Sequence, residues 1–431
     1  MDTGTCYLIK NVRLVHSGQR CVENCDILFS CRTKNQRSRV LAVGTGISMP
    51  QDRPIKLYAG ASRLFCRAFA DTASYIVGRG TRGAETYAPA AQAASSGGFS
   101  AITLMPTLAS PMDTPAAIEN LKRDCRTFDV QFLPVAALAV SERGGYRFGD
   151  YEELKKAGAV GLGVIEKKKL PGEILYTAMC RAYKADMTVF CPVSGGGFSE
   201  MGAVNEGRIS KMLRLPGIPA CAELLSVNET LLLAKASGCR VHIPVISLAE
   251  SVQAIRKAKS EGVRVTCGTS APYFSLTEDD LIFRGVNAKL DPPLRTAADR
   301  AEIIEGLCAG TIDCIAGDHR PCTAQEKGSS IATAAFGAAG LETAFAAGFT
   351  YLVLSGKMDL YTLLHKLTEA PARILGIAPE IQKGGRMDLV MLDEEKEMIY
   401  TNNTLHGRAS NTPYYGTALC GAVSDRFIDG K

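Results

Sequence analysis

Several features that would place a protein in a specialised class are missing from this sequence. It has no tryptophan, no internal repeat and no low-complexity segment. No apolar stretch reaches the roughly 18 residues that a membrane-spanning helix needs, so no membrane association is expected. The start, Met1–Cys6, lacks the basic and then apolar pattern of a signal peptide. We therefore expect a cytoplasmic protein.

The charge balance gives no sign of a nucleic-acid partner. The net charge of +5 is spread over the whole chain and forms no basic stripe. The one dense basic run is Lys167–Lys169. We interpret it as a solvated turn in preference to a site that binds a polyanion. No nucleic-acid binding is predicted.

Cysteine is abundant, with fifteen residues, but no Cys-x-x-Cys pair occurs. The closest group is Cys21, Cys25 and Cys31, in a region of β-type sequence. A zinc cluster there lacks a fourth ligand, so it is not favoured. We expect most cysteines to be reduced, small and buried apolar residues.

The length of 431 residues suits a large α/β domain with a smaller companion, and 46% hydrophobic residues provide a sizeable core. Between residues 64 and 320, eight short apolar runs alternate with helical patterns. The runs cover residues 64–71, 99–105, 130–138, 159–164, 187–193, 240–247, 263–267 and 312–318. Each is short enough to be a buried parallel strand.

Helical segments fall between most of these runs. Thr114 and Pro115 form a cap and first-turn pair that opens a helix ending near Phe128. Residues 251–260 and 298–308 have apolar residues at helical spacing and end near Gly262 and Gly310. Eight strand–helix repeats favour the α/β class and a (β/α)8 TIM barrel.

The two ends of the chain have a different pattern, with short β-type runs split by polar turns. Residues 7–15 and 40–44 are such runs near the start, and residues 387–393 are one near the end. We predict a small β-sandwich domain built from residues 1–63 and 385–431, beside a barrel of residues 64–384. Helices at 340–349 and 360–375 are expected to pack outside the barrel or to extend it.

Many short motifs occur in the order typical of one family, and together they span nearly the whole chain. They are Asn205–Gly207, Leu215–Pro219, Ala222–Glu223, Asp291–Arg295, Asp299–Arg300, Gly310–Asp313, Asp318–Cys322, Glu326–Lys327, Gly340–Ala344, Pro371–Gly376 and Asn411–Tyr414. On these motifs the chain resembles the dihydroorotases of the amidohydrolase superfamily. The resemblance implies a role in pyrimidine biosynthesis and a cyclic-amide hydrolase. It also implies a zinc site that activates water and polarises the amide carbonyl.

The resemblance also shows that this zinc site is degenerate. The first family motif, Asp-x-His-x-His-x-Arg, begins here at Asp71, and its two histidines are replaced by Ala73 and Tyr75. The arginine that grips substrate in the family is Val77. Methyl and isopropyl groups have no lone pair, and a tyrosine binds metal only as a phenolate, against a pKa near 10.

The remaining family positions repeat this loss. Those for metal ligands hold Val164 in the fourth strand region, Pro192 in the fifth and Val245 in the sixth, while His242 matches a family histidine that is not a ligand. Those that contact substrate in the family hold Thr107, Asp291 and Cys322. Asp318 alone matches a family residue with a catalytic role, as metal ligand and general base. One carboxylate cannot hold a catalytic zinc, so no metal is expected.

Three functions remain open at this point. The first is a catalytically inactive homologue with a structural or regulatory role, since metal-less relatives in the family can associate with aspartate carbamoyltransferase. The second is an active cyclic-amide hydrolase with a non-standard site. The third is a barrel that binds a small molecule in a mouth lined by Val77, Val164, Pro192 and Val245. Homo-oligomerisation is also left open.

A few other residues invite a functional interpretation, and for each a structural one is favoured. Asp318 and His319 with a cysteine nucleophile (Cys191 or Cys322) would form a metal-free site, but a role as loop anchors is preferred. His242 is expected to be a core residue. The glycine-rich segments 78–83 and 195–197 are interpreted as loops, in preference to sites that bind an anion.

Overall fold

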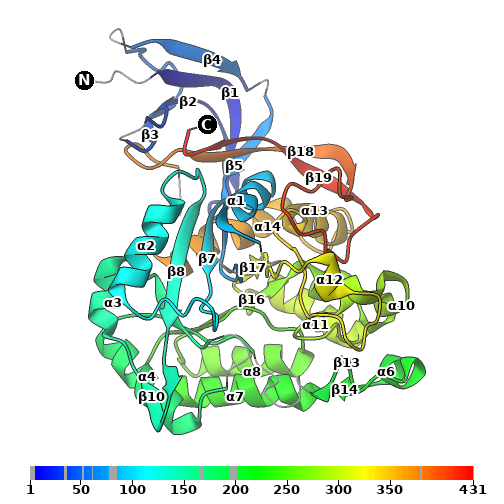
Figure 1. Cartoon of the computed structure of the whole chain (residues 1–431). Helices are drawn as coiled ribbons and strands as arrows, with labels where there is room; N and C mark the ends of the chain where they lie inside the picture. Colours follow the sequence, from blue (N-terminus) through cyan, green and yellow to red (C-terminus); the bar gives the residue numbers. More distant parts are fainter. Residues whose placement is uncertain are drawn as a thin grey trace.

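The computed structural model describes residues 5–33, 36–50, 53–60, 62–76, 85–165, 169–193, 201–378 and 381–430. Eight parallel strands form the barrel (Figure 1). In chain order they are β6 (Phe69–Asp71), β7 (Phe99–Leu104), β8 (Gln131–Ala137), β11 (Gly161–Gly163), β12 (Val189–Phe190), β15 (Val241–Ile243), β16 (Val265–Ser270) and β17 (Cys314–Ala316). Each corresponds to one of the eight predicted runs, so the predicted barrel is confirmed.

The barrel closes just beyond the ends of its first and last strands. Ser74 and His319 form a parallel bridge. The His319 amide donates to the Ala73 carbonyl at 3.0 Å, and the Tyr75 amide donates to the His319 carbonyl at 2.8 Å. Residues after β6 and after β17 are therefore held together at the carboxyl ends of the strands, where this fold class places its chemistry.

Helices return the chain between the strands, and a further one follows the last strand. They are α1 (Tyr87–Ser96), α2 (Pro115–Cys125), α3 (Tyr151–Ala157), α4 (Gly172–Lys184), α7 (Ala220–Ser237), α8 (Ala249–Ser260), α11 (Ala297–Cys308) and α14 (Leu360–Leu367). The predicted cap is confirmed, because the Thr114 side chain accepts a hydrogen bond from the Ala117 amide. No described helix is both long enough and apolar enough to cross a lipid bilayer.

Shorter elements decorate the barrel. They are β9 (Val140–Glu142), β10 (Gly145–Arg147), β13 (Val204–Asn205), α6 (Arg208–Leu213), β14 (Gly217–Ile218), α9 (Ala271–Ser275), η1 (Glu278–Asp280), α10 (Leu281–Arg284), η2 (Gly285–Ala288), α12 (Ala324–Lys327), α13 (Ala344–Gly348), η3 (Phe349–Val353) and α15 (Glu369–Leu375). The helix predicted over 360–375 is divided into α14 and α15 at Thr368. Pro371 explains the division, because it has no amide proton and fits only the first turn of a new helix.

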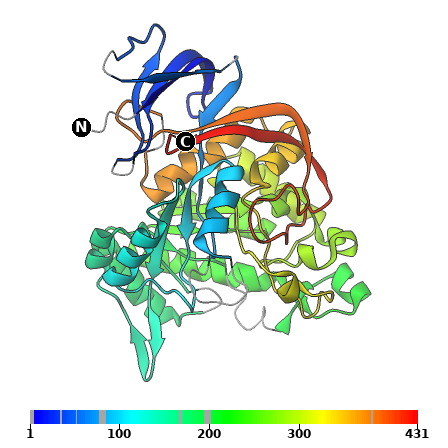
Figure 2. The same ribbon diagram turned by 45° about the horizontal axis from the view of Figure 1, so that its top comes forward.

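Both termini contribute to a seven-stranded sheet beside the barrel (Figure 2). Its strands are β1 (Cys6–His16), β2 (Cys21–Ser30), β3 (Arg39–Gly44), β4 (Ile55–Ala59), β5 (Leu64–Arg67), β18 (Asp388–Ile399) and β19 (Ala418–Ile428). Six follow the order β19-β18-β5-β1-β2-β3, and β4 pairs with β1. Buried Ile27, Phe65 and Leu389 belong to one apolar cluster on this sheet.

The sequence interpretation of residues 64–71 as one barrel strand was wrong. The run is two strands, because β5 pairs with β1 and β18 in the terminal sheet and only β6 enters the barrel. At the junction, the Ala68 amide donates to the Asp388 carbonyl and the Phe69 amide donates to the Gly98 carbonyl. Both strands are buried, so apolar character alone could not show where the chain changes sheets.

Candidate functional site

Asp318 stands at the carboxyl end of β17, where the resemblance places the family's general base. Its backbone is left-handed, with φ +46°, which is uncommon for a residue with a side chain and occurs most often at constrained sites. The Arg320 Nε lies 3.1 Å from the Asp318 Oδ1. Only 12% of the arginine side chain and 10% of the aspartate side chain are exposed, so this is a largely buried ion pair.

The same arginine stacks on Tyr75. Its guanidinium carbon lies 3.6 Å from the centre of the tyrosine ring, which is a close cation–π contact. Tyr75 is buried, and the resemblance implies a histidine ligand at its position and a further ligand at that of Asp318. The guanidinium of Arg320 therefore lies between two of the family's ligand positions, with a cation of the chain itself beside the carboxylate.

The other predicted ligand positions offer only hydrocarbon. Ala73 and Val245 are buried, while Val164 and Pro192 are half-buried at the ends of their strands. The Val164 amide donates to the Phe190 carbonyl at 3.2 Å, which continues the pairing of β11 with β12. Val77 lies outside the described residues, as do the segments 78–83 and 195–197.

The described side chains at this end of the barrel do not supply the donors of the zinc site that the fold family implies. Across the described ranges, no group of three His, Cys, Asp or Glu side chains is placed to hold a metal ion. At the family site the only carboxylate in a ligand position is engaged by Arg320. A zinc site needs three or four donors, so these residues do not fit one.

Two further buried acids lie near this end of the barrel. Asp71 accepts hydrogen bonds from the Ser74 hydroxyl and, at 2.7 Å, from the Gly317 amide, while burial raises the pKa of its carboxyl group. Glu85, whose Oε1 lies 3.5 Å from the His319 Nε2, gave no signal in the sequence. Its Oε2 accepts from the Ala409 amide at 3.3 Å, so Glu85 connects the barrel end to a late loop.

The metal-free acid–base hypothesis gains no support from the cysteines. Cys191 is buried, and burial raises the pKa of its thiol to about 12, so it stays protonated at neutral pH. The Cys322 amide donates to the Asn411 Oδ1 at 3.0 Å, which ties its loop to the end of the chain. His319 bridges Ser74 on one side and Ala338 on the other. The geometry favours the anchoring interpretation of His319.

The predicted substrate positions also have structural contacts. The Thr107 Oγ1 accepts from the Ser110 amide at 3.1 Å and holds a tight turn after β7. Asp291 precedes Pro292, whose carbonyl accepts from the Tyr273 hydroxyl at 2.7 Å. Burial, together with the charges of Asp318 and Asp291, raises the pKa of that tyrosine well above its usual value.

One polar network unites three of the sequence motifs and was not anticipated as a unit. The Glu223 carboxylate accepts from the Ser247 and Leu248 amides at 2.9 and 3.0 Å, and from the Ser247 hydroxyl. Arg295 donates to Glu223 at 3.4 Å and to the Asn205 Oδ1 at 2.7 Å. The Glu223 and Arg295 side chains are 1% and 3% exposed, so each charge depends on the other.

His242 is a core residue, as interpreted from its apolar strand. Its Nδ1 lies 2.9 Å from the Thr266 Oγ1, and its ring packs edge-on against Phe190. Burial lowers the pKa of its imidazole to about 3, so the ring is neutral at physiological pH. A base for catalysis needs contact with substrate, and this ring is fully enclosed by the barrel.

Comparison with known proteins agrees with the motifs. Residues 72–251 match the family model described as Dihydro-orotase-like. A dihydroorotase from Listeria monocytogenes (serotype 4a, strain HCC23) is 33% identical, covering 98% of this chain and 97% of its own length. One from Geobacillus sp. (strain WCH70) is 35% identical, covering 86% of this chain and 87% of its own.

Solved structures show the same fold at lower identity. The L-hydantoinase (dihydropyrimidinase) from Arthrobacter aurescens superposes with a TM-score of 0.83 at 22% identity, covering 99% of this chain and 95% of that one. The dihydropyrimidinase from Brevibacillus agri NCHU1002 gives 0.82 at 18% identity, covering 99% and 94%. Because dihydroorotases about one-third identical match nearly the whole chain, the protein belongs to the dihydroorotase family.

Proposed function

We propose that this chain is a dihydroorotase-family protein that serves pyrimidine biosynthesis in a structural or regulatory role, without hydrolysing a cyclic amide. The observation that carries the proposal is the position of Arg320, with its guanidinium stacked on Tyr75 and paired with Asp318. The family's reaction needs the metal and the free carboxylate at this place. Here a fixed cation of the chain takes the carboxylate as its partner.

Displacing the arginine would not recreate a metal site. Asp318 would then stand beside Ala73, Tyr75 and Val245, which are all buried and offer no imidazole. Moving a buried guanidinium away from its carboxylate also separates two buried opposite charges, which is costly. The substitutions and the arginine therefore support the same conclusion, that the chain has no hydrolytic site of the family type.

Turnover and metal content test this proposal directly. Purified protein should show no dihydroorotate formation from carbamoyl aspartate above background, and no stoichiometric zinc after dialysis against a chelator. The matched control is Asp318→Asn, which should give the same background rate as the wild type. A wild-type rate that this substitution abolishes would show that Asp318 still acts as a catalytic base and would overturn the proposal.

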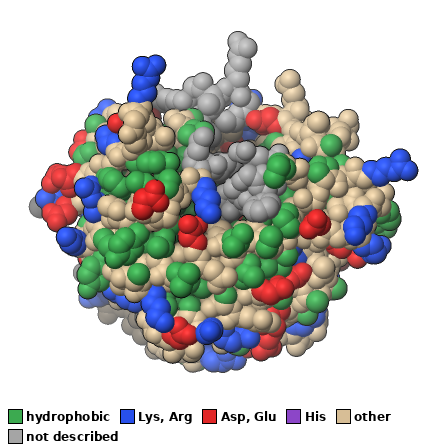
Figure 3. All heavy atoms as spheres, turned by 90° about the horizontal axis from the view of Figure 1, so that it is seen from below, with side chains coloured by type: hydrophobic (Ala, Val, Ile, Leu, Met, Phe, Trp, Pro, Cys, Tyr) green, Lys and Arg blue, Asp and Glu red, His purple; other side chains and the backbone are tan. Residues whose placement is uncertain are grey.

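A structural role needs a surface for a partner, and the outer face of α4 and α7 supports one. These helices pack together. Leu225 and Leu232 of α7 are 57% and 68% exposed, and Tyr176 and Tyr183 of α4 are 41% and 54% exposed. The underside of the molecule, where α4 and α7 lie in Figure 1, carries groups of hydrophobic side chains (Figure 3). Exposed apolar patches of this kind mark interaction surfaces.

The partner that we propose for this face is aspartate carbamoyltransferase from the same organism. Co-expression followed by size-exclusion chromatography should give a joint peak containing both proteins. The double variant Leu225→Glu/Leu232→Glu should elute separately, while Gln253→Glu on the neighbouring helix α8 should still elute jointly. Separate elution of the two wild-type proteins would contradict this partner and leave the proposal about turnover unaffected.

A further inference from the structure

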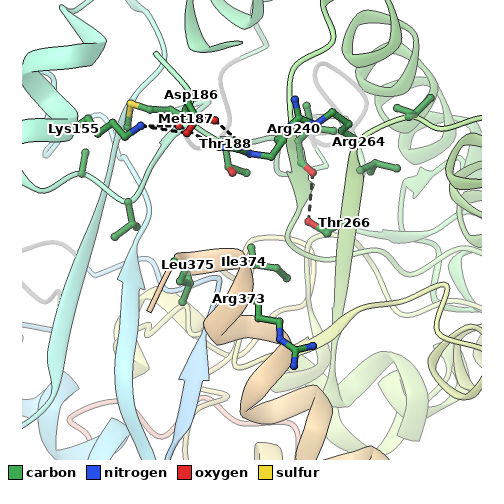
Figure 4. Close-up of a pocket in the computed structure, with 16 residues that line it drawn as sticks. Lys155, Asp186, Met187, Thr188, Arg240, Arg264, Thr266, Arg373, Ile374 and Leu375 are labelled. Atoms are coloured by element: carbon green, nitrogen blue, oxygen red, sulfur yellow. Dashed lines mark hydrogen bonds and ion pairs between the residues drawn. The ribbon is translucent and has the colours of Figure 1, made fainter. Parts of the chain in front are cut away.

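A cavity of 640 Å³ opens at the end of the barrel opposite Asp318 (Figure 4). Its walls come from residues that precede four neighbouring strands, β11, β12, β15 and β16, and from the end of helix α15. The eight barrel strands are parallel, so their amino ends share one face and their carboxyl ends share the other. The cavity is therefore separate from the degenerate metal site.

The inner wall of the cavity is apolar. Met187, Val241 and Val265 are buried residues that line it. Ile374 and Leu375 of α15 lie across the opening from Met187 (Figure 4). The volume lies within the range of about 300–1,000 Å³ that is typical of small-molecule sites. Such a wall suits a ligand that carries hydrocarbon or an aromatic ring, because binding there removes apolar surface from water.

The rim of the cavity is cationic. Lys155, Arg240, Arg264 and Arg373 all line it, and Asp186 is the one carboxylate among its lining residues. These cations come from distant parts of the chain, since Lys155 lies in α3, Arg240 and Arg264 directly precede β15 and β16, and Arg373 lies in α15. The fold therefore gathers at one opening an excess of positive charge that is not apparent along the sequence.

Two of the cations already share the carboxylate. Arg240 pairs with Asp186 at 2.7 Å and Lys155 does so at 3.5 Å. Arg264 makes fewer contacts with the protein. Among the described residues, its guanidinium donates one hydrogen bond, at 3.4 Å, to the Gly238 carbonyl. Arg373 pairs with Glu369 at 3.5 Å and is 60% exposed. Arg264 thus keeps guanidinium donors for an incoming anion, whereas the Arg373 guanidinium is turned back along α15 toward Glu369.

From this arrangement we infer that the cavity binds a small organic anion, one with a flat or branched apolar body and a carboxylate or phosphate head. The body would lie against Met187, Val241 and Val265, and the head would accept hydrogen bonds from Arg264 at the rim. Neither part suffices alone: an inorganic anion leaves the apolar wall in contact with water, and a neutral hydrocarbon leaves the guanidinium groups without a counter-charge. The inference is independent of whether the opposite end of the barrel is catalytic.

Isothermal titration calorimetry with naphthalene-2-carboxylate tests the inference on the full chain. The wild type should bind it saturably at one site, and should bind naphthalen-2-ylmethanol, its neutral counterpart, at least about tenfold more weakly, the ratio expected for one lost charge-assisted bond. Inorganic phosphate alone should give no saturable heat. Equal affinity for the acid and the alcohol, or no saturable binding of the acid, would overturn the inference.

Two variants place the site. Arg264→Glu reverses a rim charge and should weaken binding of the carboxylate by about tenfold or more without weakening the alcohol. Lys155→Glu should weaken it less, because Lys155 is already shared with Asp186. Lys156→Glu is the matched control, since this neighbour points to solvent and pairs with Glu153. If Lys156→Glu and Arg264→Glu have equal effects, binding is non-specific and the cavity is not the site.

A third variant separates the apolar wall from the rim. Val263→Phe fills part of the cavity without changing any charge, so it should weaken the acid and the alcohol together. Circular dichroism of each variant confirms folding before titration. An unchanged affinity in a folded Val263→Phe protein would place the ligand outside the cavity.

Discussion

Two polar clusters near the carboxyl ends of the barrel strands differ in how far they match the family motifs. The cluster of Glu223, Arg295, Ser247 and Asn205 keeps its motif residues and connects them by hydrogen bonds between 2.5 and 3.4 Å. The cluster around Asp318 has Ala73, Tyr75 and Val245 where the resemblance implies imidazoles, and the Arg320 guanidinium stacks on the Tyr75 ring. Both clusters are buried and both lie at motif positions. Neither burial nor motif position therefore explains why one cluster matches the family and the other does not.

The partners of each cluster explain it better. Glu223 accepts from two backbone amides and from buried Arg295, so its loss leaves protein groups without partners. A ligand histidine has the metal as its main partner, and its replacement by alanine or valine adds apolar packing instead. We therefore expect the fold to depend on the Glu223 cluster and to tolerate substitutions in the cluster around Asp318.

Removing Glu223 should produce the largest effect and would sharpen this contrast. Glu223→Ala leaves the buried Arg295 guanidinium without its counter-charge, which lowers the free energy of unfolding by about 3–5 kcal/mol. Urea unfolding followed by circular dichroism measures the change, since the chain has no tryptophan to report by fluorescence. The exposed neighbour Glu206 provides a control, with Glu206→Ala expected within about 0.5 kcal/mol of the wild type. Equal midpoints for the two variants would break the contrast.

Removing Arg320 tests whether the filled site has become structural in its turn. Arg320→Met removes the ion pair of the arginine with buried Asp318, and we expect a loss of about 2–3 kcal/mol in the same unfolding experiment. Arg320→Met/Asp318→Asn removes both charges and should recover most of that loss. If the double variant is less stable than the single one, the ion pair does not explain the stability of this region.

His242 belongs to the retained motif residues, and its burial predicts a pH dependence. Its pKa is lowered to about 3 in the folded protein, against about 6.5 when unfolded. The unfolded chain therefore binds the proton more strongly. The stability contributed by neutral His242 is fully present above about pH 6.5 and is lost as the pH falls toward 3. By pH 5 the loss is about 2 kcal/mol.

Unfolding midpoints at pH 7.5 and pH 5 measure this loss. His242→Phe keeps a ring beside Phe190 and removes the titrating group, so its change between the two pH values should be smaller than that of the wild type. An identical change in both proteins would place the pH dependence elsewhere.

Restoring a family residue in the eroded cluster should have the smallest effect. Thr107→Asn reinstates the family's side chain, and its carbonyl oxygen can replace the Thr107 Oγ1 as acceptor for the Ser110 amide. We expect stability within about 0.5 kcal/mol of the wild type and no dihydroorotate formation. A gain of turnover from this single change would show that the site is far less degraded than its ligand positions indicate.

Much of the fold could be predicted because buried parallel strands are continuous apolar runs, and all eight appear as such. The division of residues 64–71 between two sheets could not, because β5 and β6 are equally buried and the partner of β5 lies in the last part of the chain. An apolar sequence predicts that a strand is buried, but it does not predict which strand will pair with it.

The candidate site shows the same limit. Motif order predicted Asp318 and the replaced ligand positions, and these assignments stay predictions. It could not place the Arg320 guanidinium on Tyr75, because that contact depends on side-chain direction across the closed barrel. Glu85 and the cationic rim of the opposite cavity also escaped prediction. Lys155 and Arg373 lie in helices and the others lie in connecting segments, and only the fold brings them together.

The terminal sheet has a consequence for the order in which the protein can fold as it is synthesised. Strand β18 lies between β5 and β19, so the sheet joins residues 64–67 to residues 388–399 and then to residues 418–428. While the ribosome makes the barrel, β5 lacks a neighbour on one side, and β18 later waits for β19. Unpaired strand edges are sites of mispairing between chains. The nascent chain therefore carries an open β-edge through most of its translation, and this edge is where a chaperone would be needed.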